Sequence, residues 1–169
     1  MKKNLTVVFP IFNKDGDFFI LMGRQAEGKK LAGFRNGYGG KCEEGESMLD
    51  CAARELEEEL KLEEIYKIKL NNQDFKNIGS VFMDDKQIDF FVVELSQMIA
   101  PPADNSEFVD THWYDLTLPE LFVPDMLSGD ELIMEELNKF LQNREGYENF
   151  EINKTGDKKL EGQVKNIFK

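Results

Sequence analysis

The sequence predicts a single α+β domain over residues 1–169, and two observations lead to this prediction. Short apolar stretches rich in β-branched and aromatic residues are interrupted by two separate segments with helical periodicity. A hydrophobic content of 41% in 169 residues is enough for one buried core, and we find neither an internal repeat nor a linker. Strands and helices therefore belong to one folding unit.

The first two predicted strands form a β-hairpin. Residues 6–12 and 18–22 are apolar and rich in β-forming side chains, and the turn sequence NKDGD lies between them. Residues 24–41 form a loop rich in glycine and basic residues. Three β-rich stretches predict further strands, and the weakly alternating tail around KTGDK predicts a terminal β-hairpin. The three stretches are residues 65–70, 78–83 and 88–95. A fourth predicted strand, residues 109–114, follows the turn-rich sequence APPADNS.

The first predicted helix covers residues 47–61. Ser47 is a suitable N-cap, with Asp50 three residues later as a short capping-box partner. One apolar stripe follows at steps of three and four residues, made of Leu49, Ala53, Leu56 and Leu60. A second amphipathic helix is expected at 130–141.

Composition excludes several classes of protein. The formal net charge of −12 argues against a passive binder of nucleic acid or of acidic membranes. The apolar start is short and broken by Pro10, and no apolar run approaches a membrane span. Cys42 and Cys51 lack metal-site spacing, so we expect two reduced thiols in a cytoplasmic protein.

Acidic residues crowd the first helix. Arg54 can pair with Glu58 at i,i+4, but helical spacing also brings Glu55, Glu58 and Glu59 together on one patch. Two carboxylates at about 5 Å repel by roughly 3 kcal/mol at an effective dielectric of 20. Two readings follow: a solvated helix face, or a site for a hard divalent cation such as Mg²⁺, Mn²⁺ or Ca²⁺.

The spacing around this cluster decides between the two readings. Residues 40–62, GKCEEGESMLDCAARELEEELKL, resemble the Nudix box, G-x5-E-x7-R-E-U-x-E-E-x-G-U, where U is aliphatic. The single departure is Lys61 in place of the late glycine, at the helix exit, where a left-handed residue other than glycine costs about 1 kcal/mol. The resemblance implies the Nudix fold, a mixed curved β-sheet sandwiched between helices, with a terminal β-hairpin.

The resemblance also implies a reaction, the hydrolysis of a nucleoside diphosphate linked to another group, with Mg²⁺ as the cofactor and Mn²⁺ as its alternative. By this resemblance the metal ligands are Glu55, Glu58, Glu59 and the backbone carbonyl of Gly40. Glu55 is the first candidate for the base that deprotonates water. Cations at such a site neutralise the polyphosphate and lower the pKa of water.

Charged residues outside the three metal-binding glutamates take supporting roles in this interpretation. Arg54 would orient the carboxylates, and Glu46 would tie the loop to the helix through Arg54. Residues 24–41 contain five basic residues against one acidic residue. This stretch is either a solvated loop or a contact for substrate phosphates, with Lys41 as a substrate-binding candidate.

Three further segments are similar to parts of the eukaryotic-type 8-oxo-dGTP diphosphatases: FRNGYGGK, HWYDL and LPELFVPD. The resemblance makes Asn36 and Asp125 base-reading residues, while each is also a suitable turn residue. Val123 and Met126 stand where that family has an aromatic residue and a second Asp. Glu107 is either an extra site carboxylate or a surface residue.

The expected function is Mg²⁺-dependent hydrolysis of oxidised or modified purine nucleoside triphosphates to a nucleoside monophosphate and pyrophosphate, a reaction that cleanses the nucleotide pool and prevents DNA damage. Two alternatives remain open: hydrolysis of dinucleoside polyphosphates or another diphosphate, and nucleotide binding without catalysis. The expected partner is a small nucleotide, with no nucleic-acid polymer and no membrane, and the expected state is a monomer or a small homo-oligomer.

Overall fold

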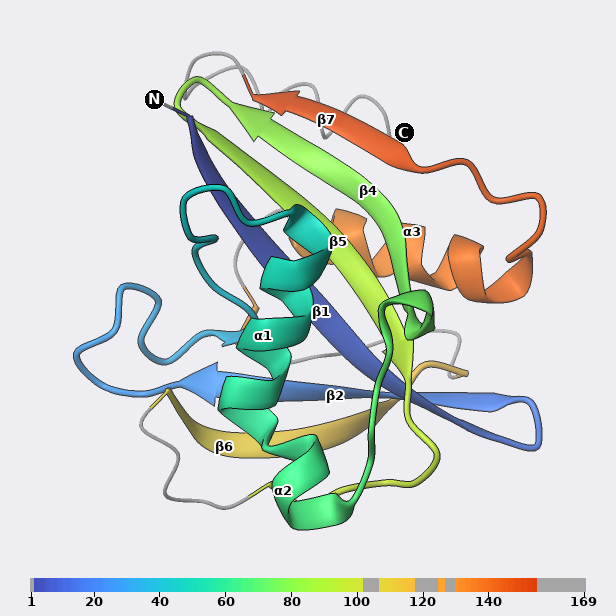
Figure 1. Cartoon of the computed structure of the whole chain (residues 1–169). Helices are drawn as coiled ribbons and strands as arrows, with labels where there is room; N and C mark the ends of the chain where they lie inside the picture. Colours follow the sequence, from blue (N-terminus) through green and yellow to red (C-terminus); the bar gives the residue numbers. More distant parts are fainter. Residues whose placement is uncertain (1, 102–106, 118–124, 127–129, 155–169) are drawn as a thin grey trace.

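In the computed structural model, helix α1 (Met48–Leu60) covers one face of a mixed β-sheet and helix α3 (Asp130–Gln142) lies on the other (Figure 1). The structure describes residues 2–101, 107–117, 125–126 and 130–154. Within them the sheet has seven strands, in the order β3-β2-β1-β5-β4-β7, and β6 also pairs with β2. The predicted α+β fold with a sheet between helices is confirmed.

The elements follow the sequence prediction along most of the chain. Most predicted strands are present and extend further than expected, because pairing with neighbours orders the polar residues at their ends. The remaining elements are β1 (Lys3–Lys14), β2 (Asp17–Gln25), β3 (Arg35–Asn36), α2 (Leu62–Tyr66), η1 (Asn72–Asp74), β4 (Phe75–Met83), β5 (Lys86–Glu94), β6 (Phe108–Asp115) and β7 (Phe150–Lys154).

The predicted N-terminal hairpin is present, with β1 and β2 antiparallel. Asp15 and Gly16 take positive φ angles of 54° and 99° at its turn, the conformation that tight hairpin turns require. Two parallel pairs, β1 with β5 and β4 with β7, make the sheet mixed. The parallel pair of β1 and β5 places the longest strand at the centre of the sheet.

Side-chain alternation along the central strands produces two cores, one on each face. In β1, Val8 belongs to the core beneath α1, while the next residue, Phe9, belongs to the core beneath α3. Helix α1 buries Ala52, Leu56 and Leu60 against the first core. Of the predicted stripe, Leu56 and Leu60 are buried, whereas Leu49 and Ala53 are only partly buried. Cys51 and Ala52 take the other buried positions that hold α1 on the sheet.

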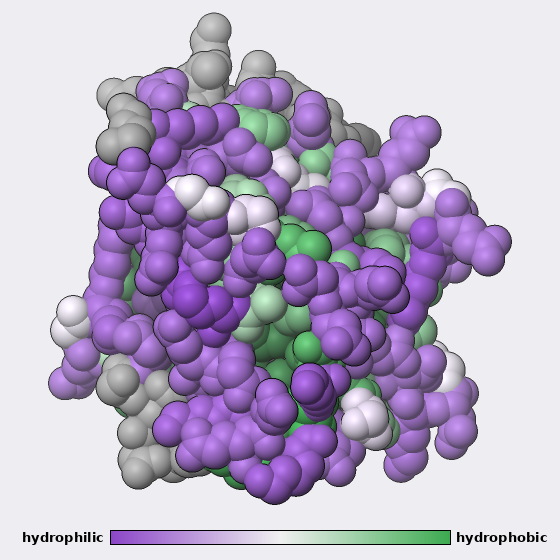
Figure 2. Space-filling view, viewed as in Figure 1, coloured by the Kyte–Doolittle hydropathy of each residue, from purple (hydrophilic) through white to green (hydrophobic). Residues whose placement is uncertain are grey.

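The face that carries α1 is mostly covered by polar side chains, and the apolar atoms in view gather mainly near its centre (Figure 2). Among the helices that the structure describes, none has the length and apolar character needed to cross a membrane.

The strand predicted at 65–70 is wrong. A new short helix, α2, begins after Lys61, and Ile65 is exposed rather than part of a sheet. Lys61 and Lys67 both adopt left-handed backbone conformations, so the chain turns sharply before and after α2. The apolar residues that suggested a strand instead belong to this turn, which brings Leu62 and Ile68 into the core beneath α1.

Two further differences concern short or terminal segments. The predicted loop 24–41 contains β3, a strand of two residues that pairs with β2 and carries no periodic signal of its own. The first arm of the predicted terminal hairpin is β7, which pairs with β4. The second arm lies outside the described residues.

The ends of α1 are fixed by local interactions. Ser47 is the N-cap, and its hydroxyl accepts a hydrogen bond from the Asp50 N–H at 3.1 Å. The Asp50 carboxylate accepts from the Ser47 hydroxyl at 2.6 Å, so the predicted capping box forms only in part. At the other end, Lys61 has φ 50° and ψ 47°, and its N–H donates to the Glu57 carbonyl.

Lys61→Gly should raise the free energy of unfolding by about 1 kcal/mol, because glycine occupies the left-handed region without a Cβ penalty. The exposed ion pair of Lys61 with Glu64 contributes little to this balance. Urea unfolding measures the effect. Lys61→Ala removes the same ion pair but keeps the Cβ, so it serves as the control and should not be stabilised. Equal stability of the Gly and Ala variants would contradict the backbone explanation.

Candidate active site

The loop that opens the box lies along β1. The Thr6 N–H donates to the Gly40 carbonyl at 2.9 Å, and isolated bridges join Val8 to Tyr38 and Leu5 to Lys41. A Cβ on Gly40 would lie 2.5 Å from a Glu55 carboxylate oxygen. The absence of a Cβ at Gly40 therefore lets the Glu55 carboxylate lie against the loop backbone, and a side chain here would displace it.

The three glutamates predicted as metal ligands lie on the side of α1 that faces this loop. Glu59 accepts a hydrogen bond from the Gly39 N–H at 3.0 Å, and Glu55 lies against Gly40. Glu58 is more exposed, with its carboxylate 3.4 Å from the Arg54 guanidinium. The three predicted carboxylates therefore lie on one side of α1, next to the glycine loop.

The charge of these carboxylates is costly without a cation. Burial raises the pKa of Glu59 to about 9, and the nearby Glu55 carboxylate acts in the same direction. Burial also raises the pKa of Glu55, against the opposing effect of Arg54. The partly buried carboxylates of Glu55 and Glu59, with their raised pKa values, fit a hard divalent cation such as Mg²⁺. Glu55, Glu59 and the more exposed Glu58 are the residues that would hold it.

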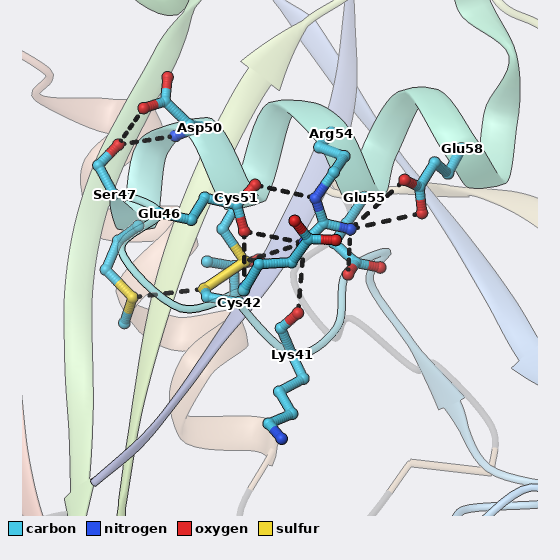
Figure 3. Close-up of a disulfide and its surroundings, with 12 residues drawn as sticks. Lys41, Cys42, Glu46, Ser47, Asp50, Cys51, Arg54, Glu55 and Glu58 are labelled. Carbon is cyan, nitrogen blue, oxygen red and sulfur yellow. Dashed lines mark hydrogen bonds and ion pairs between the residues drawn. A yellow bond between two sulfur atoms is a disulfide. The ribbon is translucent and has the colours of Figure 1, made fainter. Parts of the chain in front are cut away.

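Arg54 connects the loop and the helix (Figure 3). Its Nε and Nη2 donate to the two carboxylate oxygens of Glu46 at 2.8 and 2.9 Å. Its Nη1 donates to Glu55 at 2.8 Å, and its Nη2 also donates to the Lys41 carbonyl at 3.3 Å. Arg54 and Glu46 thus form the expected contact between loop and helix, and their part in catalysis stays a prediction. Hydrogen bonds from Arg54, and then from the Glu43 N–H, lower the pKa of Glu46 to about 2.

The expectation of two reduced thiols is wrong for this structure, because Cys42 and Cys51 form a disulfide. Their Cα atoms are 5.2 Å apart, within the range that a disulfide spans. The sequence spacing alone gave no sign of this pairing. The loop folds back onto the first turns of α1, where the bidentate contact of Glu46 with Arg54 closes the same segment.

Asn36 and Asp125, the predicted base-reading residues, come close together although they are distant in sequence. The N–H of Arg35, next to Asn36, donates to the Asp125 carbonyl at 2.8 Å. The Asn36 side chain accepts from the Gly37 N–H, and the Asp125 carboxylate is about half exposed. The Lys41 side chain is exposed on the box loop.

The sequence departs from the diphosphatase pattern at Val123 and Met126, and the structure describes the second of these residues. Met126 packs against the core beneath α3, so an apolar side chain is accommodated where that family has Asp. Val123 lies outside the described residues.

A cluster of charges beside Asp125 was missed by the sequence analysis. Arg35 is buried, and its guanidinium pairs with Asp110, while Arg24 binds the same carboxylate at 3.0 Å. These bonds, from Arg35 above all, lower the pKa of Asp110. The three residues come from β3, β2 and β6, so only strand pairing brings them together and no local motif could have revealed them.

Glu107, the predicted extra carboxylate, forms an ion pair with Lys29. It is also close enough to Glu59 to contribute to the raised pKa of that carboxyl. This placement at the edge of the glutamate cluster agrees with a site residue, and its role stays a prediction.

A sequence model of the NUDIX domain matches residues 2–135. The chain belongs to the NUDIX domain family. Among curated proteins, an isopentenyl-diphosphate Delta-isomerase from Cereibacter sphaeroides is 32% identical to this Nudix domain over 73 residues, which are 43% of this chain and 41% of the isomerase. The match thus spans less than half the length of that relative.

Solved structures with this fold include a MutT/nudix family protein from Enterococcus faecalis, with 15% identity and a TM-score of 0.61. That match covers 86% of this chain and 64% of the other. A structure from a study of MutT of Aliivibrio salmonicida and Vibrio cholerae has 20% identity and a TM-score of 0.57, covering 83% of this chain and all of the other (100%). At these identities the likeness concerns the fold of the Nudix domain.

Gly40→Ala should weaken Mg²⁺ binding to this Nudix domain by at least about tenfold, because the new Cβ displaces the Glu55 carboxylate. Titration calorimetry with Mg²⁺ measures the affinity. Gly45→Ala is the matched control from the same loop: its φ of +80° strains an alanine, but a Cβ there meets nothing within 4 Å. Unchanged Mg²⁺ affinity in Gly40→Ala would contradict the placement of Glu55.

Acid should weaken the contact of Glu46 with Arg54 in a defined range. The pKa of Glu46 is lowered from 4.5 to about 2, so the ionised pair stabilises the fold fully above pH 4.5 and loses its contribution as pH falls towards 2. Glu46→Gln should therefore be less stable than the wild type at neutral pH, with a difference that shrinks below pH 4.5. Urea unfolding at several pH values tests this, and a difference independent of pH would contradict it.

Proposed function

We propose that this Nudix domain is a Mg²⁺-dependent nucleoside triphosphate pyrophosphohydrolase that acts on oxidised or otherwise modified purine nucleotides. The observation that carries the proposal is the approach of Asp125 to the strand of Asn36, directly before the glycine loop that faces the box glutamates. A side chain able to read a purine edge, Asn36, thus lies on the strand that leads into the glycine loop, and Asp125 approaches this strand. The family match and the MutT-like fold support a Nudix hydrolase.

The residues of the box divide the work of hydrolysis. Cations held by Glu55, Glu58, Glu59 and the Gly40 carbonyl would neutralise the polyphosphate and lower the pKa of water. Arg54 holds one Glu55 oxygen, and both oxygens of this carboxylate lie next to Gly40. Glu55 is therefore oriented to accept a proton from water on the side of the loop. The bond between nucleoside monophosphate and pyrophosphate breaks, and pyrophosphate leaves.

Base selection would come from polar groups rather than from shape alone. Asn36 offers an amide that both donates and accepts, and Asp125 offers a carboxylate that accepts. A site that hydrogen-bonds a base edge rejects a base lacking the matching groups, because its own polar groups are then left unpaired. The Arg24 guanidinium lies 3.9 Å from the Asp125 carboxylate, so a charged donor stands beside this candidate base-reading group.

Glu58→Gln should lower turnover by at least about 100-fold, since loss of an outer-shell partner alone costs up to that amount and Glu58 would bind the cation directly. Glu57→Gln is the matched control, because Glu57 lies on the same helix but hydrogen-bonds the Glu63 N–H away from the site. Pyrophosphate release measures turnover, and thermal unfolding shows that both variants are folded. Full turnover in Glu58→Gln would refute the metal assignment.

A substrate panel tests the proposed specificity. Pyrophosphate release with Mg²⁺ is compared for dGTP, 8-oxo-dGTP, 2-hydroxy-dATP and O6-methyl-dGTP, with diadenosine tetraphosphate followed by its nucleotide products. We expect kcat/KM for one modified purine to exceed that for dGTP by at least about tenfold, and Asp125→Ala to abolish most of this preference. Equal rates, or a preference for the dinucleotide, would retain hydrolysis but refute base reading by Asn36 and Asp125.

A further inference from the structure

We propose that Cys42 and Cys51 form a reversible thiol–disulfide site that controls the geometry of the glutamate cluster, and that a dithiol reductant is its natural class of reagent. In the oxidised protein the disulfide fixes the box loop to α1. Reduction removes the covalent link between the box loop and α1 and weakens cation binding. The effect on hydrolysis rests on the proposed function, whereas the redox chemistry and the effect on Mg²⁺ do not.

The disulfide lies inside the machinery of the box rather than at its margin (Figure 3). Cys42 follows Gly40 by two residues, and Cys51 precedes Arg54 by three. The Cys51 sulfur is 4.0 Å from Arg54 Nη2 and 3.5 Å from the Thr6 hydroxyl. A change at this bond therefore reaches the group that orients Glu46 and Glu55.

Two anchors hold the box loop, and the disulfide links them. On one side the loop is bound to β1, because the Cys42 N–H donates to the Asn4 carbonyl and the Thr6 N–H donates to the Gly40 carbonyl. On the other side, Cys51 is buried in α1. The other contacts between loop and helix are hydrogen bonds, from the Gly39 N–H to Glu59 and from Arg54, whose side chain is a quarter exposed. The disulfide is the covalent contact between the loop that carries Gly40 and the helix that carries Glu55.

The two sulfurs differ in access. Cys51 is fully buried, at 0% exposure, while Cys42 retains 9% and borders the exposed residues 43–45. A reductant should therefore attack at Cys42. A thiolate of the dithiol bonds to the Cys42 sulfur, and the bond to Cys51 breaks. Cys51 leaves with the electron pair and takes up a proton.

The second thiol of the reductant then completes the exchange. It loses its proton and attacks the reductant sulfur of the mixed disulfide, which releases Cys42 as a thiol. Two electrons have passed to the protein, and the reductant has become a cyclic disulfide. The reverse sequence with an oxidised dithiol restores the link, so the site can cycle without any metal.

The test uses the full chain with reduced or oxidised dithiothreitol. Maleimide labelling under denaturing conditions, read by mass spectrometry, should show no adduct in the oxidised protein and one on each cysteine, Cys42 and Cys51, after reduction. Reduction should lower the Tm by roughly 5–10 °C and weaken Mg²⁺ affinity by about tenfold, both restored on reoxidation. The double variant Cys42→Ser, Cys51→Ser should match the reduced protein and ignore dithiothreitol.

The outcomes separate this inference from the proposed function. Cysteines that both remain labelled after oxidation, or a disulfide that resists reduction in the folded protein, would overturn the site. A disulfide that cycles without changing Mg²⁺ affinity would overturn the control of the cluster. A redox-dependent Mg²⁺ affinity in a protein that hydrolyses no nucleotide would uphold the site while refuting the proposed function.

Discussion

The site depends on one interaction above the others, the contact of the Arg54 guanidinium with Glu46 and Glu55. A helix that carries several carboxylates on one side is destabilised by their repulsion unless a cation lies among them. Arg54 is that cation within the chain itself, and its planar fork binds both oxygens of Glu46 while it holds Glu55. The same side chain therefore stabilises the helix, closes the loop and fixes the direction of a carboxylate.

The sheet supplies the rigid platform for this contact. Strand β1 contributes to both cores through alternate side chains, and its backbone binds the glycine loop. Helix α1 also packs on this strand through its apolar side chains. The position of the loop relative to the helix is therefore fixed by β1. The close approach of Gly40 to Glu55 follows from this arrangement, and a side chain at Gly40 would disturb it. Buried carboxylates with raised pKa values are the consequence, and they suit a site that binds divalent cations.

The opposite end of the candidate site is organised by ion pairs between strands. Asp110 joins Arg24 and Arg35, which fixes the edge of the sheet beside Asn36 and Asp125. Arg35 also lies over the Tyr114 ring at 5.6 Å, so its charge is compensated on two sides. Under the proposed function, substrate choice would depend on several strands of this Nudix domain, whereas hydrolysis would depend on one loop and one helix.

The sequence by itself determined the parts that are local. Helix α1 and the set of Glu55, Glu58 and Glu59 follow from spacing, since residues three and four apart share one side of a helix. The Ser47 cap and the hairpin of β1 and β2 follow from short local sequences. Only the tertiary structure decided the rest. Four features arise where chain segments meet: the disulfide of Cys42 with Cys51, the short strand β3, the helix α2 and the pairing of Asp110 with Arg35. Such contacts depend on strand order and loop path, which no local pattern encodes, and this is the physical reason why the sequence predicted the hydrolytic box but not the link that closes it.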